Sequence, residues 1–208
     1  MTAVAPFVLV VDDDPSVRKG LTRLLASAGY AVEAFASARE FLAHPPHPGP
    51  CCLVLDVRMP GLTGIELQEL LAATGRRMSI LFVTGHVDVP TSVKAMKAGA
   101  VDLLTKPVDA RDLLAAIRRA VTRDEHDRAA EARRAEVHRC VGKLTARETE
   151  VFARVVTGML NKQIGAVLGI GEKTVKVHRA RVMEKVQAGS FAELVRPADE
   201  AAVTVPTT

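Results

Sequence analysis

The sequence predicts an α/β domain followed by a smaller all-helical domain. Up to about residue 120, short apolar runs alternate with amphipathic stretches, which indicates a parallel sheet with helices on both faces. The later part of the chain shows short helical patterns without strand patterns. It also holds the basic bias, because residues 143–196 contain 10 Lys and Arg against 5 Asp and Glu, whereas residues 1–120 contain 13 and 12. The two domains therefore suit different partners.

Five runs predict the strands, and each is followed by an amphipathic stretch: "FVLVV" at 7, "AVEAF" at 31, "CLVL" at 52, "SILFV" at 79 and "VDLL" at 101. The connections carry helix-start signals. Asp14 can cap a helix that has Pro15 at its first position, and Gly64 opens "GIELQELLAA" after the turn "RMPGLTG". These signals predict helices directly after the first and third strands.

A connector follows the last strand. Residues 109–141 are rich in Ala, Arg and Glu and contain neither Pro nor Gly, which predicts a helix that begins packed on the sheet and continues as a charged connector. Beyond it, Thr145 and Glu148 form a predicted capping box. We therefore divide the chain into an α/β domain (1–121), a helical linker (122–141) and a helical domain (142–208).

Composition limits the class of protein. The 208 residues, 48% of them apolar, can bury a real core. No apolar run approaches the roughly 20 residues of a membrane span, and the N-terminus lacks the features of a signal peptide, so we expect a cytoplasmic protein with no membrane partner. The three cysteines form neither a disulfide framework nor a metal-binding spacing. We expect them to be small buried residues.

Polar residues follow four of the five predicted strands: Asp12, Asp13, Asp14, Asp56, Thr84 and Lys106. In an open parallel sheet, ligands bind outside the carboxyl ends of the strands, so these residues should converge on one edge. The carboxylates would repel one another, but Mg²⁺ bound by oxygen ligands removes that conflict. Lys106 and Thr84 suit phosphoryl oxygens. Asp14 is expected to serve only as a helix cap.

The first domain resembles the receiver domain of bacterial two-component response regulators, over about residues 5–121. The resemblance rests on "VVDDDPSVRKGL", "LVLDVRMPGLTGIEL" and "FVTGHVDVPTSVKAMKAGAVDLLTKP". It implies a doubly wound five-stranded sheet of order 2-1-3-4-5. It also implies that Asp56 accepts a phosphoryl group from the phosphohistidine of a sensor histidine kinase.

The resemblance further implies roles for the strand-end residues. Asp13 and Asp56 would bind Mg²⁺ directly, together with the backbone carbonyl of Arg58, and Asp12 would act largely through water. Thr84 and Lys106 would contact the phosphoryl group. The bond from Lys106 to Pro107 is expected to be cis, which aims the ammonium.

Leu103 departs from the receiver pattern, because receivers usually carry Tyr or Phe three residues before the lysine. The usual aromatic readout is therefore in doubt. We expect the phosphoryl group to draw Thr84 and its loop, His86 to Pro90, toward Asp56. A homodimer would then form through the segment "VPTSVKAMKAGAVDLL". Because the aromatic residue is missing, we expect a smaller free-energy difference between the inactive and active states, and hence some dimerisation without phosphorylation.

The second domain carries a helix-turn-helix signal in "NKQIGAVLGIGEKTVKVHRARVMEKVQAGS". A helix from about Asn161 to Leu168 ends at Gly169, and another begins near Lys173. On the second helix, Val175, Val182 and Val186 should face the core. The opposite face, suited to the major groove, holds Lys176, Val177, Ala180 and Arg181. The expected phosphate contacts come from Asn161, Lys162, Lys173 and Thr174.

This segment resembles the LuxR-type helix-turn-helix, and the whole chain resembles the FixJ and NarL class of response regulators. A small departure is Gly171, where the family often has a Ser cap. The last residues, "ADEAAVTVPTT", fall outside the resemblance and are expected to fray. The resemblance implies a transcription regulator rather than an enzyme. Its partners would be a sensor histidine kinase, double-stranded promoter DNA and a second copy of the chain, with RNA polymerase as a possible further partner.

Two other functions are weighed against this one. A phospho-aspartyl hydrolase would need a second acid/base near the nucleophile, such as DxDxT, but the chain reads "VRMP" after Asp56. A receiver that controls protein or RNA binding has no feature in its favour, since residues 143–196 fit a DNA reader. The sequence therefore favours DNA binding controlled by phosphorylation.

Overall fold

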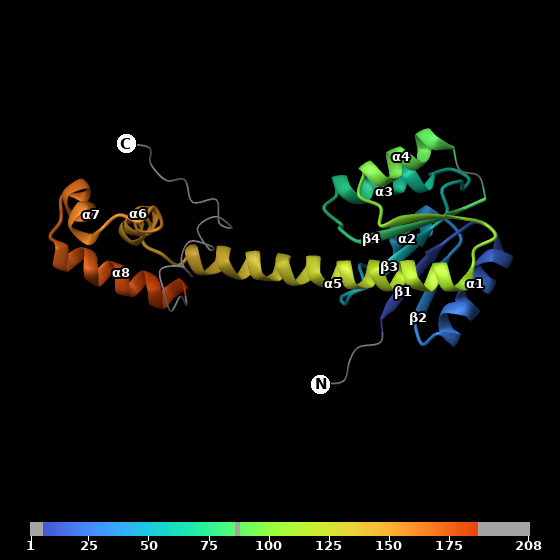
Figure 1. Ribbon diagram of the computed structural model, residues 1–208, viewed down its shortest axis with the longest axis horizontal. Coiled ribbons are helices and arrows are strands. Elements are labelled where there is room, and N and C mark those ends of the chain that lie inside the picture. Colours follow the sequence, from blue (N-terminus) through green and yellow to red (C-terminus); the bar gives the residue numbers. More distant parts are fainter. Residues whose placement is uncertain (1–5, 86–87, 187–208) are drawn as a thin grey trace. The chain divides into compact units, whose positions relative to one another are not determined.

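The computed structural model describes residues 6–85 and 88–186 (Figure 1). The chain divides into two compact units, the first ending at Arg128 and the second beginning at Ala129. The expected frayed end, "ADEAAVTVPTT", and part of the loop His86 to Pro90 lie outside the described residues. We describe each unit by itself.

The first unit alternates strands and helices. Its elements are β1 (Phe7–Val11), α1 (Pro15–Ser27), β2 (Ala31–Phe35), α2 (Ala38–Ala43), β3 (Cys51–Leu55), α3 (Gly64–Ala73), β4 (Ser79–Thr84), α4 (Val89–Lys97), β5 (Asp102–Thr105) and α5 (Ala110–Val141). The strands form one parallel sheet in the order β2-β1-β3-β4-β5. Both the predicted fold class and the strand order are confirmed.

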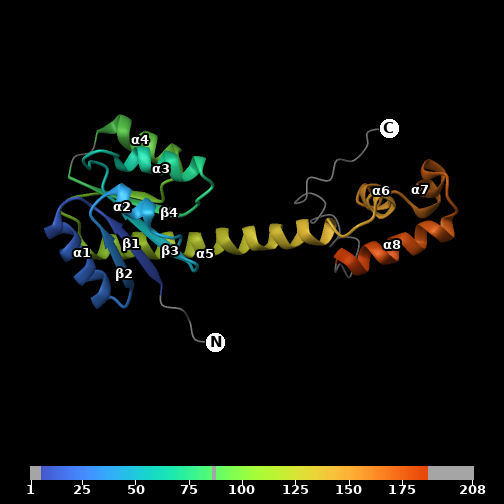
Figure 2. The same ribbon diagram turned by 180° about the vertical axis from the view of Figure 1, so that it is seen from behind.

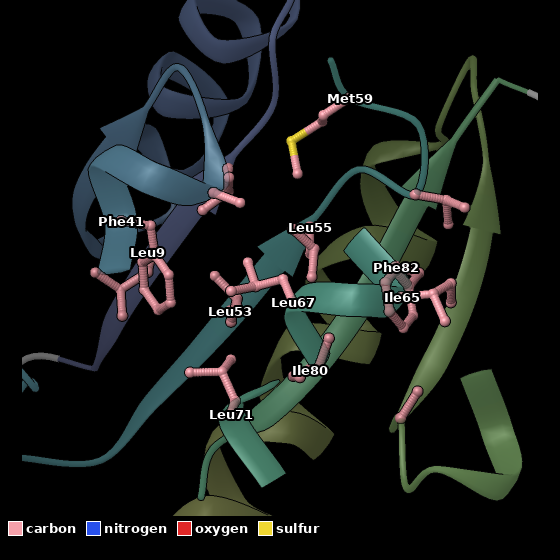
Figure 3. Packing of buried hydrophobic residues seen from close by; sticks show 14 of the residues in the cluster. Leu9, Phe41, Leu53, Leu55, Met59, Ile65, Leu67, Leu71, Ile80 and Phe82 are labelled. Carbon is pink, nitrogen blue, oxygen red and sulfur yellow. The ribbon is translucent and has the colours of Figure 1, made fainter. Parts of the chain in front are cut away.

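Apolar cores cover both faces of the sheet. One face packs against α2, α3 and α4 through a cluster that includes Phe41, Leu67 and Phe82 (Figure 3). The other face packs against α1 and α5, with Leu25 and Ile117 fully buried. Figure 2 shows the same layers from behind. Because β3 lies in the middle of the sheet, all five of its residues are buried.

Local sequence signals fix the helix starts near the carboxyl ends of the strands. The Asp14 side chain accepts the amides of Ser16 and Val17, as expected of a cap. At α3 the cap is Thr63, which forms a full capping box with Glu66. Both helices therefore begin at fixed points just after β1 and β3.

Helix α5 carries a buried acid in line with its apolar face. Asp124 is only 3% exposed, and its carboxylate accepts the backbone amide of Cys51 at 3.0 Å and Arg128 Nε at 2.6 Å. The Arg128 guanidinium also contacts the carbonyl of Pro48. These contacts bind α5 to the start of β3 beyond the last apolar turn of the helix.

The second unit is helical, with α6 (Ala146–Val155), α7 (Asn161–Leu168) and α8 (Glu172–Val186) after the end of α5. Gly169 ends α7 in the left-handed conformation at φ 66°, as a sharp turn between the helices requires. Helix α8 begins one residue before the expected Lys173. The apolar residues Val175, Val182 and Val186 are buried around Phe152, which confirms the predicted core face of α8.

Two composition-based predictions can be compared with the structure. All three cysteines are buried free thiols. Burial raises the pKa of Cys52 above the usual range for a thiol. Within residues 6–85 and 88–186, no helix combines the length and apolar character that crossing a membrane demands.

A buried ion pair ties the first helix of the second unit to the last. Glu148 is 3% exposed, and its carboxylate accepts the Thr145 amide at 2.8 Å and Lys185 Nζ at 2.6 Å. The Lys185 hydrogen bond is the main cause of a pKa for Glu148 of about 2, well below that of a free glutamate. Above pH 5 both the cap and the pair are fully formed.

Lowering the pH should therefore weaken the second unit. The folded state holds Glu148 ionised, so its contribution is present above a pH of about 4.5 and is lost as the pH falls toward 2. Glu148→Gln should cost about 1–2 kcal/mol at pH 7, less than the shift alone implies because Lys185 is one-third exposed. Hydrogen exchange of α6 amides should show this difference shrinking as the pH falls below about 4.5 and closing only near pH 2. The exposed neighbour Glu150→Gln is the matched control, and a pH-independent difference would contradict the assignment.

Candidate functional site

The strand-end residues converge at the carboxyl edge of the sheet. One oxygen from each of Asp12, Asp13 and Asp56 lies within 4.8 Å of the other two. Lys106 Nζ donates to Asp12 Oδ2 at 2.6 Å and to Asp56 Oδ2 at 2.7 Å. The bond from Lys106 to Pro107 is cis, as expected. The acidic side chains and Lys106 therefore lie close together, at the ends of three different strands.

The cluster is largely withdrawn from water. Asp12 and Asp56 are 2% and 7% exposed, and Asp13 is exposed. Burial raises the pKa of Asp12, although hydrogen bonds from Lys106 and the Asp14 amide act in the opposite direction. Burial also lowers the pKa of Lys106, but its hydrogen bonds to both carboxylates outweigh that effect and the pKa is raised. Lys106 thus stays a cation between the two acids.

Backbone contacts fix the direction of both buried acids. The Arg58 amide donates to Asp56 Oδ1 at 3.1 Å, and the Asp14 amide donates to Asp12 Oδ1 at 2.9 Å. Each carboxylate therefore has one oxygen held by the backbone and the other by Lys106. Three carboxylates at this separation are a donor set that fits a hard divalent cation such as Mg²⁺.

Thr84 and Leu103 lie on neighbouring strands next to the cluster. Thr84 is buried at the end of β4, opposite Thr105 of β5, and its carbonyl accepts the Lys106 amide at 2.8 Å. Leu103 lies opposite Phe82 in the β4–β5 register. It is half-buried against the apolar core between the sheet and helices α3 and α4. The leucine that replaces the expected aromatic residue therefore lies against that core.

Two contacts that shape this edge were not predicted from the sequence: the close approach of Gly64, which was expected only to open a helix, and a hydrogen bond from Arg18. A Cβ atom on Gly64 would lie 2.2 Å from the carbonyl oxygen of Asp56, so only glycine permits α3 to approach the backbone there. Arg18 Nη1 donates to the Asp12 carbonyl at 2.6 Å. A glycine at the first position of a helix, where other residues are better helix formers, is a signal that could have indicated the close approach.

A second candidate site is the outer face of α8. The four residues predicted to read base edges, Lys176, Val177, Ala180 and Arg181, are all exposed, opposite the buried valines. Val177 is 50% exposed, so its methyl groups are accessible on this basic face. Lys162, Lys173 and Thr174, predicted to contact phosphates, are also exposed, at the starts of α7 and α8.

Asn161 differs from the other predicted contacts, because its side chain is partly engaged within the protein. It is half-buried, and its Oδ1 accepts Arg179 Nη1 at 3.2 Å. This bond joins the start of α7 to the middle of α8. Arg179 was not among the predicted site residues, and its spacing along α8 gave no sign of a contact 18 positions away.

The turn between the two helices also depends on a close approach. A Cβ atom on Gly165 would lie 2.7 Å from the carbonyl oxygen of Ile170. The Gly171 carbonyl accepts the amides of Thr174 and Val175, so the backbone of a glycine forms the first hydrogen bonds of α8. The α7–α8 pair is therefore a tightly closed helix-turn-helix.

Two family models match the chain. Residues 8–118 match the model described as "Response regulator receiver domain". Residues 142–198 match "Bacterial regulatory proteins, luxR family". The first match spans the strand-end cluster, and the second spans the helix-turn-helix.

Curated relatives and solved structures agree with these matches. Nodulation protein W of Bradyrhizobium diazoefficiens is 46% identical over 91% of this chain and 83% of its own length. The transcriptional regulatory protein FixJ of Azorhizobium caulinodans is 43% identical, over 95% of this chain and 97% of its own. The low-resolution structure of the response regulator StyR is 45% identical and has a TM-score of 0.81, covering 95% of this chain and 100% of that one.

Replacing Gly64 should disturb the candidate metal site through the backbone of Asp56. In Gly64→Ala the new methyl group must push the Asp56 carbonyl away, which should cost about 1–3 kcal/mol of stability. We expect Mg²⁺ affinity, measured by titration calorimetry, to fall several-fold. Gly20→Ala, within α1, is the control, because a Cβ atom there meets nothing within 4 Å. Wild-type stability and Mg²⁺ affinity in Gly64→Ala would contradict the close approach.

Proposed function

The chain belongs to the response regulators that join a receiver domain to a luxR-family DNA-binding domain, and we propose that Asp56 is its phosphoacceptor. Proteins of this family regulate transcription under the control of sensor kinases. The observation that carries the proposal is the bridge from Lys106 Nζ to the carboxylates of Asp12 and Asp56. The bridge holds both buried carboxylates beside a cation, and of the two it is Asp56 that occupies the phosphoacceptor position in the resemblance to receiver domains.

The proposed reaction is an in-line phosphoryl transfer. A carboxylate oxygen of Asp56 attacks the phosphorus of the kinase phosphohistidine, the P–N bond breaks, and the electron pair stays with the imidazole, which takes a proton. Lys106, which pairs with the carboxylates beforehand, can then contact a phosphoryl oxygen. Thr84, at the end of the neighbouring strand, would supply a hydroxyl to another.

A divalent cation is the proposed cofactor of the first unit. When bound, Mg²⁺ would neutralise part of the charge that gathers on the phosphoryl oxygens. Asp12, Asp13 and Asp56 would hold it, together with the backbone carbonyl of Arg58. The cation would also relieve the repulsion among the carboxylates, which Lys106 offsets only in part.

The outer face of α8 is the proposed reader of DNA. Lys176 and Arg181 can donate to guanine edges in the major groove, and Val177 can meet a thymine methyl group. We propose that the DNA phosphates are contacted by Lys162, Lys173, Thr174 and Asn161. The exposure of all but Asn161 supports this assignment. Asn161 can still donate through its amide nitrogen, while its oxygen accepts from Arg179.

Phosphorylation is proposed to act through a homodimer. One short recognition helix buries too little surface for tight specific binding, so paired half-sites are expected. Helix α4 offers a pairing surface, since Val89, Val93 and Met96 lie exposed at helical spacing. Residues 122–141 are the proposed connector to the domain at 142–208. RNA polymerase remains a proposed further partner, and the cytoplasm the proposed location.

Asp56→Asn should abolish phosphorylation. The variant keeps the shape of the side chain but cannot form an acyl phosphate, so label from acetyl phosphate should fall at least 100-fold, and EDTA should abolish labelling of the wild-type protein. Asp14→Asn is the control, because the Asp14 side chain caps α1 and the substitution keeps the backbone amide that donates to Asp12, so this variant should label normally. Persistent labelling of Asp56→Asn, or labelling insensitive to EDTA, would show that the nucleophile or the metal requirement is assigned wrongly.

Two classes of α7–α8 variant should affect DNA binding differently. Arg181→Ala should lose about 1–3 kcal/mol on the specific site and relax its sequence preference, whereas Lys162→Ala should weaken binding to all sequences and reduce the salt slope by about one. Gel-shift titrations over a range of salt concentrations measure both. Lys143→Ala is the control, because it removes a charge that is not among the proposed DNA contacts and keeps the backbone carbonyl that accepts Lys185 Nζ. Equal losses on specific and random duplexes for Arg181→Ala would refute its role as a base reader.

A further inference from the structure

Helix α4 is held to the first unit by few contacts. Only Ala95 of its nine residues is buried, and Thr91 and Ser92 are half-buried. Its three large apolar residues point outward, with Val89 76% exposed. By contrast, the neighbouring α3 buries Ile65, Leu67 and Leu71. Because α4 packs only the small side chain of Ala95 into the core, its polar contacts contribute strongly to where this helix lies.

One buried polar contact lies near the C-terminal end of α4. Gln68, on α3, is 3% exposed and donates from Nε2 to the carbonyl of Ala95 at 3.2 Å. The same carbonyl accepts the amide of Ala100, which closes the end of the helix. The exposed pair of Glu69 and Lys94 adds little to this hold, since both side chains are more than half exposed.

The side-chain oxygen of Gln68, unlike its nitrogen, has no hydrogen-bond partner in the part of the chain that the structure describes. This atom, Oε1, is buried, and none of the described residues donates to it. A buried acceptor left unsatisfied is unfavourable, and an apolar residue of the same size would fill this position with equal or greater stability. Stability alone therefore does not explain a glutamine here, whereas its donor contact to α4 does.

The N-terminal end of α4, opposite to the end that contacts Gln68, lies close to Thr84 along the chain. Val89, its first residue, follows Thr84 by only five positions. A pull on Thr84 therefore reaches this end of the helix first. The end with Ala95 is bound to α3 and the end with Val89 is bound to the segment after β4, so a displacement of Thr84 would turn α4 rather than translate it.

We propose that Gln68 is the pivot of α4: it holds the C-terminal end of the helix on α3 while the N-terminal end follows Thr84. Gln68 is thus a positioning residue for the phosphorylation switch, and the proposal rests on the proposed function. A fixed pivot converts a small movement at Thr84 into a rotation of the surface formed by Val89, Val93 and Met96. This residue would replace part of the guidance that an aromatic side chain at position 103 would give.

The test compares the full-length wild-type protein with Gln68→Met, which keeps the length of the side chain but cannot donate. Without phosphorylation, the amides of Ala98, Gly99 and Ala100 should exchange about fivefold faster, as expected for the loss of one hydrogen bond. Labelling of Asp56 by acetyl phosphate should be unchanged. The shift in the dimer dissociation constant caused by beryllofluoride, measured by sedimentation, should shrink about fivefold.

Two further variants sharpen the result. Gln68→Asn keeps the amide but is one methylene too short to reach Ala95, so it should behave like Gln68→Met. Glu69→Gln, the control on the same helix, should match the wild type in every measurement. Wild-type exchange in both Gln68 variants would overturn the pivot, and so would faster exchange with an unchanged beryllofluoride response. Failure of the wild-type protein to take label would instead overturn the proposed function, because that result comes from a separate measurement.

Discussion

The ammonium of Lys106 between the carboxylates of Asp12 and Asp56 is the interaction on which the first unit's site depends. Two buried acids on adjacent strands would repel each other, and their pairing with one cation offsets that repulsion. The constraint extends outward. Lys106 must follow β5, Asp12 must follow β1 and Asp56 must follow β3, so the order of the strands and the position of the charges are parts of the same requirement.

The same requirement explains the small residues around the cluster. Asp56 can face Lys106 only if the chain after β3 turns sharply, and Gly64 allows α3 to begin against the Asp56 carbonyl. The capping box of Thr63 and Glu66 then fixes that start. The capped helix starts thus surround the acids, whereas α4 buries only Ala95, so few packed side chains oppose a displacement of this helix.

The sequence could predict what depends on position along a strand or a helix. The strands, the acids with Lys106 and the buried valines of α8 follow from such patterns, whereas the strand order followed from the resemblance to receiver domains. The structure agrees with all of them. It could not predict contacts between distant segments, such as Asp124 with the Cys51 amide or Gln68 with the Ala95 carbonyl. These depend on how closely two helices or a helix and a strand approach, which no periodicity records. The start of α8 one residue early has a local reason, because the Gly171 carbonyl accepts the first amides.

The contacts of Asp124 have a consequence for protein engineering. A receiver excised at Val121, where the apolar face of α5 ends, would lose the acceptor for the Cys51 amide in the centre of the sheet, at a cost of about 1–3 kcal/mol. A junction placed after Arg128 would keep both that acceptor and its guanidinium partner. Chimeras that graft this receiver onto a different output domain should therefore be joined after Arg128, seven residues beyond the point that hydrophobic periodicity suggests.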